Sequence, residues 1–462
     1  MTSPLSMPDP SGPDGMPPAQ RRRAMAAILV GIGLAFLDTA IANTALPTIA
    51  ADLGIDSAAS IWIVSAYQLA VVATLLPVAA LGEIVGQQRV FTAGIALFSG
   101  ASLACALAWS LPALIAARLL QGIGAGAVMS VNIALVRFIT PADRLGRGVG
   151  LNAFVASVCF VAGPPVASLI LLVLPWPWLF AVNLPIGLAA LALALAALPD
   201  TGRAAHAFDG PGAVLTVVTF SLLVLGLGEI AHGGPGWRNG AELGGAVVLG
   251  LLLLRRQASH PAPMLPVDLL TRPLFALSAA AAAGAFVAQG LAFVSLPFLF
   301  QRALGRSQFE AGFLMVPWTI AVALVAPLAG RLSDRYPSGL LGGIGLMGLG
   351  LGLGLLAALP SDPSLGDVAW RMAACGAGFG VFQAPNLRAL MTSAPPARAG
   401  GASALAATAR LLGQTTGAAL VAACFALANG RGPTLALGLG GIVAGAASLV
   451  SVARLAVRPD PQ

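Results

Sequence analysis

Residues 118–126 read Arg-Leu-Leu-Gln-Gly-Ile-Gly-Ala-Gly, and a related stretch, Arg-Met-Ala-Ala-Cys-Gly-Ala-Gly-Phe-Gly, occupies residues 371–380. A second, unrelated pair recurs at nearly the same interval: Leu-Gly-Glu stands at 81–83 and Leu-Ser-Asp at 332–334. Two motifs that recur at one spacing indicate that the chain contains a duplicated half. Repeats of this kind are typical of membrane transporters, whose substrate sites lie between the repeats.

The composition excludes a soluble protein. Hydrophobic residues make up 58% of the 462 residues, charged residues only 9%, and mean hydropathy is +0.90. Soluble domains carry about 25% charged residues, so a soluble enzyme, a coiled coil and a disordered chain are ruled out. The runs of Ala, Leu and Gly also lack the apolar–polar alternation of an outer-membrane barrel. The remaining fold class is an all-α polytopic membrane protein.

Spanning helices account for most of the chain, because each needs about 20 mostly apolar residues. The predicted spans are 25–46, 62–82, 89–109, 112–136, 149–172, 179–198, 211–231, 241–254, 274–299, 309–331, 339–359, 369–392, 402–428 and 433–456. These fourteen transmembrane helices form two halves of six with two helices inserted between them, an order of 6+2+6.

This arrangement divides the chain into five parts. They are a disordered cytoplasmic tail at 1–24, an N-terminal six-helix bundle at 25–198, two inserted helices with linkers at 199–273, a C-terminal six-helix bundle at 274–456 and a cytoplasmic tail at 457–462.

The basic residues predict orientation. The net charge is +7, the chain has no Lys, and its basic residues are arginines that lie mostly near the ends of apolar runs. Most of them, including the cluster at 21–23, fall on the side of the N-terminus, which the positive-inside rule assigns to the cytoplasm. We therefore predict a multi-pass protein of the cell inner membrane with both termini in the cytoplasm. No basic stripe indicates nucleic-acid binding.

Four stretches carry a family resemblance. They are Leu-Asp-Thr-Ala-Ile-Ala-Asn-Thr-Ala-Leu-Pro at 37–47, the stretch 118–126, Gly163-Pro164-Pro165, and Trp-Pro-Trp-Leu-Phe-Ala-Val-Asn-Leu-Pro-Ile-Gly at 176–187. Together they resemble the motifs of the fourteen-helix drug:proton antiporters of the major facilitator superfamily, the multidrug efflux type. The resemblance extends over essentially residues 21–458.

The resemblance implies a secondary transporter that exports amphipathic, often cationic drugs or toxic compounds in exchange for protons by alternating access. It implies small-molecule substrates, protons and membrane lipids as partners, a monomeric state, and no cofactor other than the proton gradient. Export of one endogenous metabolite is the closest alternative, and a membrane-embedded enzyme or an ion channel are remoter ones. The histidines at 206, 232 and 260 form no metal or catalytic spacing, so we expect neither an enzyme nor a metal site.

Asp38 and Arg118 are the predicted proton-coupling residues. Asp38 lies about 13 residues into the first span and Arg118 about six into the fourth, which runs the opposite way, so both lie roughly 20 Å from the inner surface. An ionised group at that depth needs a partner or a cavity. Asp38 is expected to carry the proton and Arg118 to be coupled to it; the alternative is a fixed ion pair that joins two helices.

Other polar residues within the spans are candidates for the substrate cavity. They are Asn43, Tyr67, Gln68, Gln121, Asn132, Gln289, Gln383, Asn386, Arg410 and Gln414. Each is equally compatible with a hydrogen bond between helices, and Arg410 could also extend its charged end to the inner surface.

Two gate motifs and one antiporter motif complete the candidate residues. The gate residues are Glu83, Gly86 and Arg89 in the first half and Gly330, Asp334 and Arg335 in the second. The first copy has lost most of the basic residues of the family pattern. The antiporter motif is Gly163, Pro164 and Pro165, whose prolines should bend the helix; Ala167 and Ser168 stand where the family has paired glycines.

Orientation can be tested by labelling cysteines placed in two loops. A membrane-impermeant maleimide added outside should leave the 199–210 loop unlabelled and label the 232–240 loop, because the two loops are predicted on opposite sides. The reverse pattern would contradict the predicted topology.

Overall fold

The structure is a computed structural model that describes residues 16–141, 145–201, 208–231, 236–259, 267–394, 399–428 and 430–457. Residues 1–15 and 458–462, which make up most of the predicted tails, lie outside the described residues, as do 202–207 and 232–235 of the two loops named above. Within the described residues all regular secondary structure is helical, and no strand occurs.

The helices of the N-terminal half are α1 (Pro18–Asp52), α2 (Ser57–Ser60), α3 (Trp62–Val85), α4 (Gln87–Ala106), α5 (Leu111–Ile139), α6 (Leu145–Val173), α7 (Trp178–Ala181) and α8 (Asn183–Ala197). Between the halves lie α9 (Gly210–Ala231), α10 (Gly236–Ser259) and α11 (Val267–Leu270). The C-terminal half contains α12 (Pro273–Phe298), the π-helical turn η2 (Leu299–Ala303), α13 (Gln308–Leu314), α14 (Val316–Leu332), α15 (Ser338–Ala357), α16 (Leu365–Thr392), α17 (Ala399–Leu427), α18 (Gly432–Ala453) and the 3₁₀ turn η4 (Arg454–Ala456).

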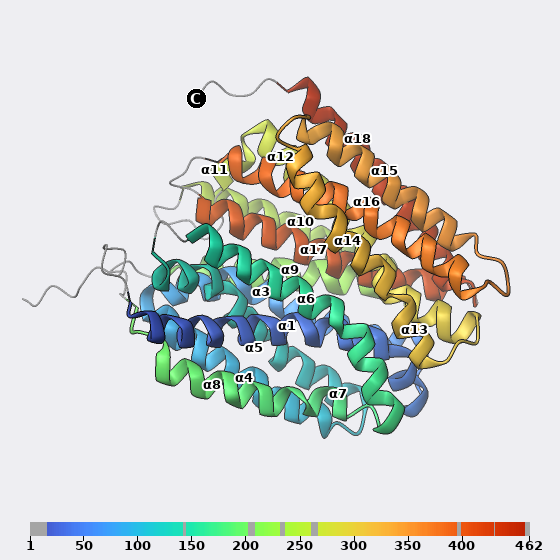
Figure 1. Ribbon diagram of the computed structural model, residues 1–462, viewed down its shortest axis with the longest axis horizontal. Helices are drawn as coiled ribbons and strands as arrows, with labels where there is room; N and C mark the ends of the chain where they lie inside the picture. The colour runs from blue at the N-terminus through green and yellow to red at the C-terminus, as the bar shows by residue number, and fades with distance from the viewer. Residues whose placement is uncertain are drawn as a thin grey trace, which may run out of the picture.

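The two halves use the same helix pairings. In the first, α3 and α4 both pack on α5, and α1 packs on α6; in the second, α14 and α15 both pack on α16, and α12 packs on α17. Figure 1 shows the halves side by side, with the blue-to-green helices below and the yellow-to-red helices above. The inserted α9 contacts α3, α17 and α10. The recurrence of the pairings agrees with the duplication that the paired motifs indicate.

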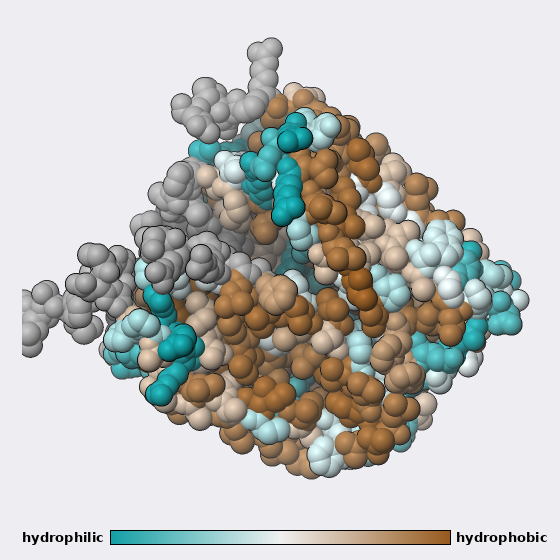
Figure 2. Space-filling model, viewed as in Figure 1, coloured by the Kyte–Doolittle hydropathy of each residue, from teal (hydrophilic) through white to brown (hydrophobic). Residues whose placement is uncertain are grey.

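Most of the helices are long and apolar enough to cross a membrane. Among the described residues, eleven helical segments satisfy that condition, and α9, α10 and α16 fall outside it. Leu324, Leu351 and Ile442 are each more than half exposed, and Figure 2 shows a broad apolar surface across the middle of the molecule with polar side chains toward its ends. An apolar surface of this kind is stable in lipid rather than in water. The chain is therefore a multi-pass membrane protein.

Several helices differ from the predicted spans at their ends. Helix α1 begins at Pro18 rather than at residue 25, so residues 18–24 of the expected tail are helical. Proline suits the first turn because its missing N–H has no helical partner there. The predicted span at 309–331 is interrupted at Met315, two residues before Pro317, and the span that began at 274 continues into the π-helical turn η2. The length of an apolar run does not predict where a helix is interrupted or changes its hydrogen-bond pattern.

We call the end of the molecule at which α1 begins the proximal end, and the end that carries the α4–α5 and α15–α16 loops the distal end (left and right in Figure 1).

Glycines bring helices of the second half into close contact. A Cβ atom added to Gly345 of α15 would lie 2.6 Å from the backbone nitrogen of Phe382 and 2.7 Å from the carbonyl oxygen of Gly378, both in α16. A Cβ atom on Gly378 would lie 2.4 Å from the backbone nitrogen of Leu349. These neighbours are backbone atoms and cannot rotate away, so the α15–α16 contact depends on the absence of side chains.

We expect Gly345→Ala to destabilise the protein by about 1–3 kcal/mol, the usual cost of overpacking, because α15 and α16 would have to separate. Gly354→Ala is the matched control in the same helix, since nothing lies within 4 Å of its added Cβ. Thermal unfolding in detergent should show a lower midpoint for Gly345→Ala and an unchanged or higher one for Gly354→Ala. Equal midpoints would contradict the close packing.

Candidate functional site

A buried ion pair joins α1 and α5. The Nη1 atom of Arg118 lies 2.6 Å from Oδ2 of Asp38, and both side chains are fully buried. The structure thus brings the two predicted coupling residues together. Because a charge removed from water is costly unless it is paired, each residue depends on the other.

Hydrogen bonds satisfy most of the remaining polar atoms of the pair, and only Nη2 of Arg118 has no hydrogen-bond partner among the described residues. Oδ1 of Asp38 accepts from Nε2 of Gln121 at 2.9 Å and from Nδ2 of Asn183 at 2.7 Å, and Nε of Arg118 donates to the carbonyl oxygen of Ile63 at 3.1 Å. The carboxylate therefore accepts from three donors, the arrangement that suits its ionised form. Ser102, whose hydroxyl oxygen accepts from Gln121 at 2.8 Å, was missed by sequence reasoning because a lone serine in an apolar helix carries no signal.

Aromatic rings enclose the guanidinium. The Cζ atom of Arg118 lies 4.2 Å from the centroid of the Tyr67 ring and 5.4 Å from that of Phe180. The hydroxyl group of Tyr67 donates to the carbonyl oxygen of Ala35 at 3.2 Å, which fixes the ring against α1. The Tyr67 ring therefore lies between the ion pair and the space that separates the two halves.

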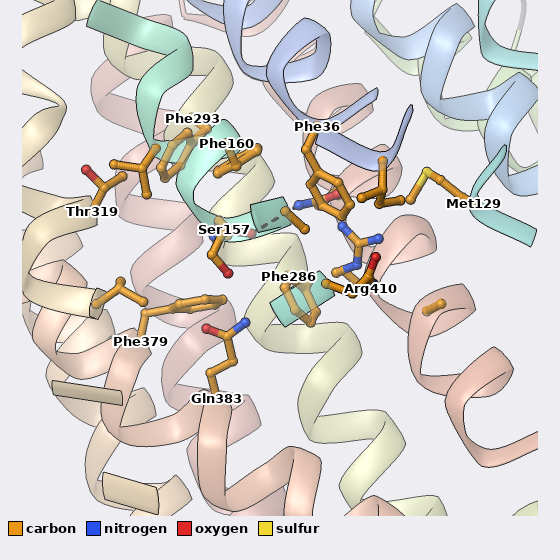
Figure 3. Close-up of a pocket in the computed structure, with 18 of the residues that line it drawn as sticks. Phe36, Met129, Ser157, Phe160, Phe286, Phe293, Thr319, Phe379, Gln383 and Arg410 are labelled. Carbon is orange, nitrogen blue, oxygen red and sulfur yellow. Dashed lines mark hydrogen bonds between the residues drawn. The ribbon is translucent and has the colours of Figure 1, made fainter. Parts of the chain in front are cut away.

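That space holds a cavity of about 310 Å³, lined by α1, α3, α5 and α6 of one half and by α12, α14, α16 and α17 of the other. Apolar and aromatic side chains dominate the wall (Figure 3). On its distal side, Phe160 and Phe293 meet across the halves at 5.3 Å between ring centroids, and Phe293 packs edge-on against Trp318 at 5.2 Å. The polar and charged lining residues are Asn132, Asn152, Ser157, Gln289, Thr319, Gln383, Arg410 and Gln414.

Arg410 is the cationic residue of this wall. Its guanidinium carbon lies 4.8 Å from the centroid of the Phe36 ring, and Figure 3 shows the group beside that ring within the cavity. The structure therefore places Arg410 in the cavity and not at the inner surface. Among the described residues, Arg410 has no hydrogen bond or ion pair, and no carboxylate lines the cavity.

The other predicted cavity residues divide into groups. Asn132, Gln289, Gln383 and Gln414 line the cavity, and Gln414 donates to Oε1 of Gln289 at 3.1 Å. The remaining first-half candidates lie elsewhere: Gln121 belongs to the ion-pair cluster, whereas Asn43, Tyr67 and Gln68 border two small hollows beside the cavity.

Asn386 lies outside the cavity lining. Its Oδ1 accepts from Nη1 of Arg454 at 2.8 Å, and the same nitrogen donates to Ser278 at 3.1 Å. Arg454 is only 3% exposed, although the sequence places it at the cytoplasmic end of the last predicted span, where an exposed arginine is expected. This cluster joins α12, α16 and α18 near the proximal end and is a structural contact.

The gate motifs lie at the proximal end. Gly86 has φ = 108°, a conformation that favours glycine, and Thr201 accepts there from the backbone N–H of Gln87 at 2.7 Å. In the second half, where the gate motif begins at Gly330, Asp334 forms an ion pair with Arg388. Arg388 was not among the predicted residues. Arg89 and Arg335 are exposed.

The antiporter motif lies where α6 meets both halves. A Cβ atom on Gly163 would lie 2.2 Å from Cβ of Ala40 in α1, and one on Gly312 of α13 would lie 2.7 Å from the carbonyl oxygen of Pro164. Ser168, the departure from the family pattern, donates to the carbonyl oxygen of Gln308 at 3.0 Å. Pro165 lies within α6. The motif therefore closes the distal side of the interface between the halves.

Two related helical halves with an aromatic cavity between them and a buried charge pair beside it define the class of secondary membrane transporters. A sequence model described as the Major Facilitator Superfamily matches residues 28–418. The chain belongs to the Major Facilitator Superfamily. It is accordingly a transporter and not an enzyme.

Three relatives are similar over most of the chain. The Uncharacterized transporter YebQ of Escherichia coli strain K12 is 48% identical over 96% of this chain and 97% of its own. The Riboflavin transporter RibZ of Clostridioides difficile is 29% identical over 86% of this chain and 87% of its own. The Multidrug resistance protein Stp of Mycobacterium tuberculosis is 31% identical over 88% of this chain and 76% of its own.

Removing one partner of the ion pair should destabilise the protein strongly. We expect Arg118→Met to cost about 3–5 kcal/mol, because it leaves a buried carboxylate without its cation. Asp38→Asn combined with Arg118→Met should cost less than the sum of the single changes, since the two residues form one unit. Thermal unfolding of the four proteins in detergent measures the coupling, and additive losses would show that the residues act independently.

Proposed function

We propose that the protein is a proton-coupled exporter of amphipathic compounds, including drugs and toxic compounds, that works by alternating access. The observation that carries the proposal is the position of the Asp38–Arg118 pair, which lies buried beside the cavity with Tyr67 between them. Asp38 is the proton carrier in this proposal, and Arg118 is the cation that proton binding releases from its partner.

A small hollow provides the route between the two sites. Its volume is about 20 Å³, and its lining includes Thr39 and Tyr67 on the side of the ion pair and Arg410 and Gln414 on the side of the cavity. Movement of the Tyr67 ring would therefore join Asp38 to the cavity. A substrate in the cavity would lie next to this hollow, because Arg410 and Gln414 line both spaces. It would then favour or oppose the movement of Tyr67, which is the coupling an exchanger requires.

Contacts between the halves support alternating access. At the distal end, Nε2 of Gln301 donates to the carbonyl oxygen of Thr44 at 3.5 Å, and Arg302 donates to the hydroxyl oxygen of Ser57. Together with the Ser168 contact, these bonds hold the two halves together at the distal end. Rocking of the halves would break them and open the distal side, as in other transporters with internal repeats.

The finer topology is part of the proposal. We infer that α9, α10 and α16 also span the membrane, which gives fourteen helices and places the chain among the fourteen-helix drug:proton antiporters. At 1.5 Å per residue, these helices are about 33 Å or longer, enough for a hydrocarbon core of about 30 Å. The arginine distribution favours an inner-membrane protein with both termini in the cytoplasm. A monomeric state is a further part of the proposal, carried over from the family resemblance. The five-part division of the chain follows from this topology.

The nature of the cavity supports an amphipathic substrate. Its volume is at the lower end of small-molecule sites, which are mostly apolar with a few polar groups. Stp is named for multidrug resistance, which favours drug export, whereas RibZ is named for riboflavin, which favours the alternative of a single metabolite. Inward movement of one proton charge through 100 mV supplies about 2.3 kcal/mol, which can drive export of a substrate that carries no positive charge.

The proposal is tested by proton release. When an exported amphipathic dye binds the detergent-solubilised protein, an exchanger should release protons, and Asp38→Asn should abolish the release because its side chain carries no titratable proton. Asp362→Asn is the matched control, since its exposed carboxylate lies at the distal surface.

Transport is measured in parallel. Proteoliposomes with and without a pH gradient should show gradient-driven dye flux for the wild type and Asp362→Asn and none for Asp38→Asn. Proton release or driven flux that persists in Asp38→Asn would show that the proton travels elsewhere, and Asp38 would then be a structural partner of Arg118.

A further inference from the structure

We propose that Arg410 makes the central cavity selective for amphipathic compounds that carry an anionic group, with a carboxylate as the best fit. The inference rests on the proposed function in one respect, that the cavity is the substrate site. It replaces the expectation of cationic substrates, which came from the family resemblance alone.

The charge of the residues that line the cavity favours an anionic substrate. Arg410 is the only charged residue that lines the cavity within the described residues. The buried carboxylate of Asp38 does not line the cavity, and it already accepts hydrogen bonds from Arg118, Gln121 and Asn183. A cation at the wall of an apolar cavity favours a bound anion and repels a bound cation, because the low dielectric constant strengthens both effects.

The geometry of the Arg410 guanidinium group favours a carboxylate in particular. Stacking against Phe36, with 4.8 Å between Cζ and the ring centroid, orients the group while leaving its N–H donors without a hydrogen bond among the described residues. A planar guanidinium binds a carboxylate through two parallel hydrogen bonds. The amide group of Gln383, which faces the cavity in Figure 3, offers a further donor.

The rest of the cavity wall fits the apolar part of such a compound. Phe160, Phe286, Phe293 and Phe379 surround the cavity in Figure 3. Phe286 and Phe379 pack edge to face at 5.6 Å between centroids. Rings arranged in this way accept a flat aromatic body, so the preferred substrate is an aromatic ring system that bears an acidic group.

The charge of the substrate also changes the energetics of exchange. If one proton enters for each monoanion that leaves, the exchange carries the equivalent of two positive charges into the cell. The inside-negative membrane potential therefore drives both movements. Exchange of one proton for one monocation moves no net charge. Export of the anion should therefore depend on the membrane potential as well as on the pH gradient.

Two dyes with the same ring system but opposite charge test the preference. Fluorescein, an anion with a carboxylate, and rhodamine 6G, a cation, are titrated against detergent-solubilised protein, and the Kd is measured by fluorescence anisotropy. We expect the wild type to bind fluorescein more tightly than rhodamine 6G. Arg410→Gln should weaken fluorescein binding by about tenfold or more, the value of a charge-assisted hydrogen bond, and should not weaken rhodamine 6G binding.

Two further variants control for net charge and folding. Arg431→Gln removes one exposed arginine at the distal end and should leave both Kd values unchanged. Arg410→Lys keeps the charge but loses the planar donor pair, so it should restore fluorescein binding in part. Thermal unfolding of each variant shows whether it has folded.

The results separate this inference from the proposed function, because binding needs no proton gradient. Equal loss for both dyes in Arg410→Gln, a wild-type preference for rhodamine 6G, or no fluorescein binding to the wild type would each overturn the inference. Proton-driven flux of rhodamine 6G could then still support the exchanger. Conversely, a preference for fluorescein that depends on Arg410, without proton-driven flux of either dye, would support the inference and refute proton exchange.

Discussion

The ion pair between Asp38 and Arg118 is the constraint around which the first half is built. Two full charges lie at 0% exposure, a situation that membranes and protein interiors tolerate only with paired charges and satisfied hydrogen bonds. Ile63 and Asn183, from two further helices, supply hydrogen bonds to the pair. Ser102 bonds Gln121 beside it, and the Phe180 ring lies next to the guanidinium, whose Nη2 has no hydrogen bond among the described residues. The positions of these helices are therefore fixed by one electrostatic requirement, and the cavity wall that they share with Tyr67 is fixed with them.

The second half has no equivalent pair in the described residues and meets its polar requirements differently. Arg454 is buried among serine and asparagine oxygens, and Arg410 stands in the cavity with an aromatic ring as its neighbour. One half thus carries a neutralised charge pair and the other a cation open to a ligand. This asymmetry between duplicated halves separates the proposed proton site from the proposed substrate site, with Tyr67 between them.

The proposed exchange would follow from that separation. Protonation of Asp38 would weaken its hold on Arg118, and an anion at Arg410 would neutralise the other cation that faces Tyr67. Each event changes the charge next to the same small hollow, so each alters the free energy of the other. Coupling of this kind between two binding events is reciprocal by thermodynamic necessity. For transport, the proposed exchange also needs the cavity to open alternately to the two sides of the membrane.

The sequence by itself determined the membrane class, and it predicted the duplication and a shared depth for Asp38 and Arg118, which the structure places in contact. Apolar length, repeat spacing and helical rise are local quantities and can be obtained without a fold. It did not determine which polar residues face one another. Gln121 and Asn386 had the same helical spacing signals as true cavity residues, yet one binds Asp38 and the other Arg454. Likewise, Arg454 was indistinguishable from an exposed arginine at the end of a span and Arg410 from a snorkelling one. Only the packing of helices distant in the chain decides these partners, since a side chain's face depends on the rotation of its helix against its neighbours.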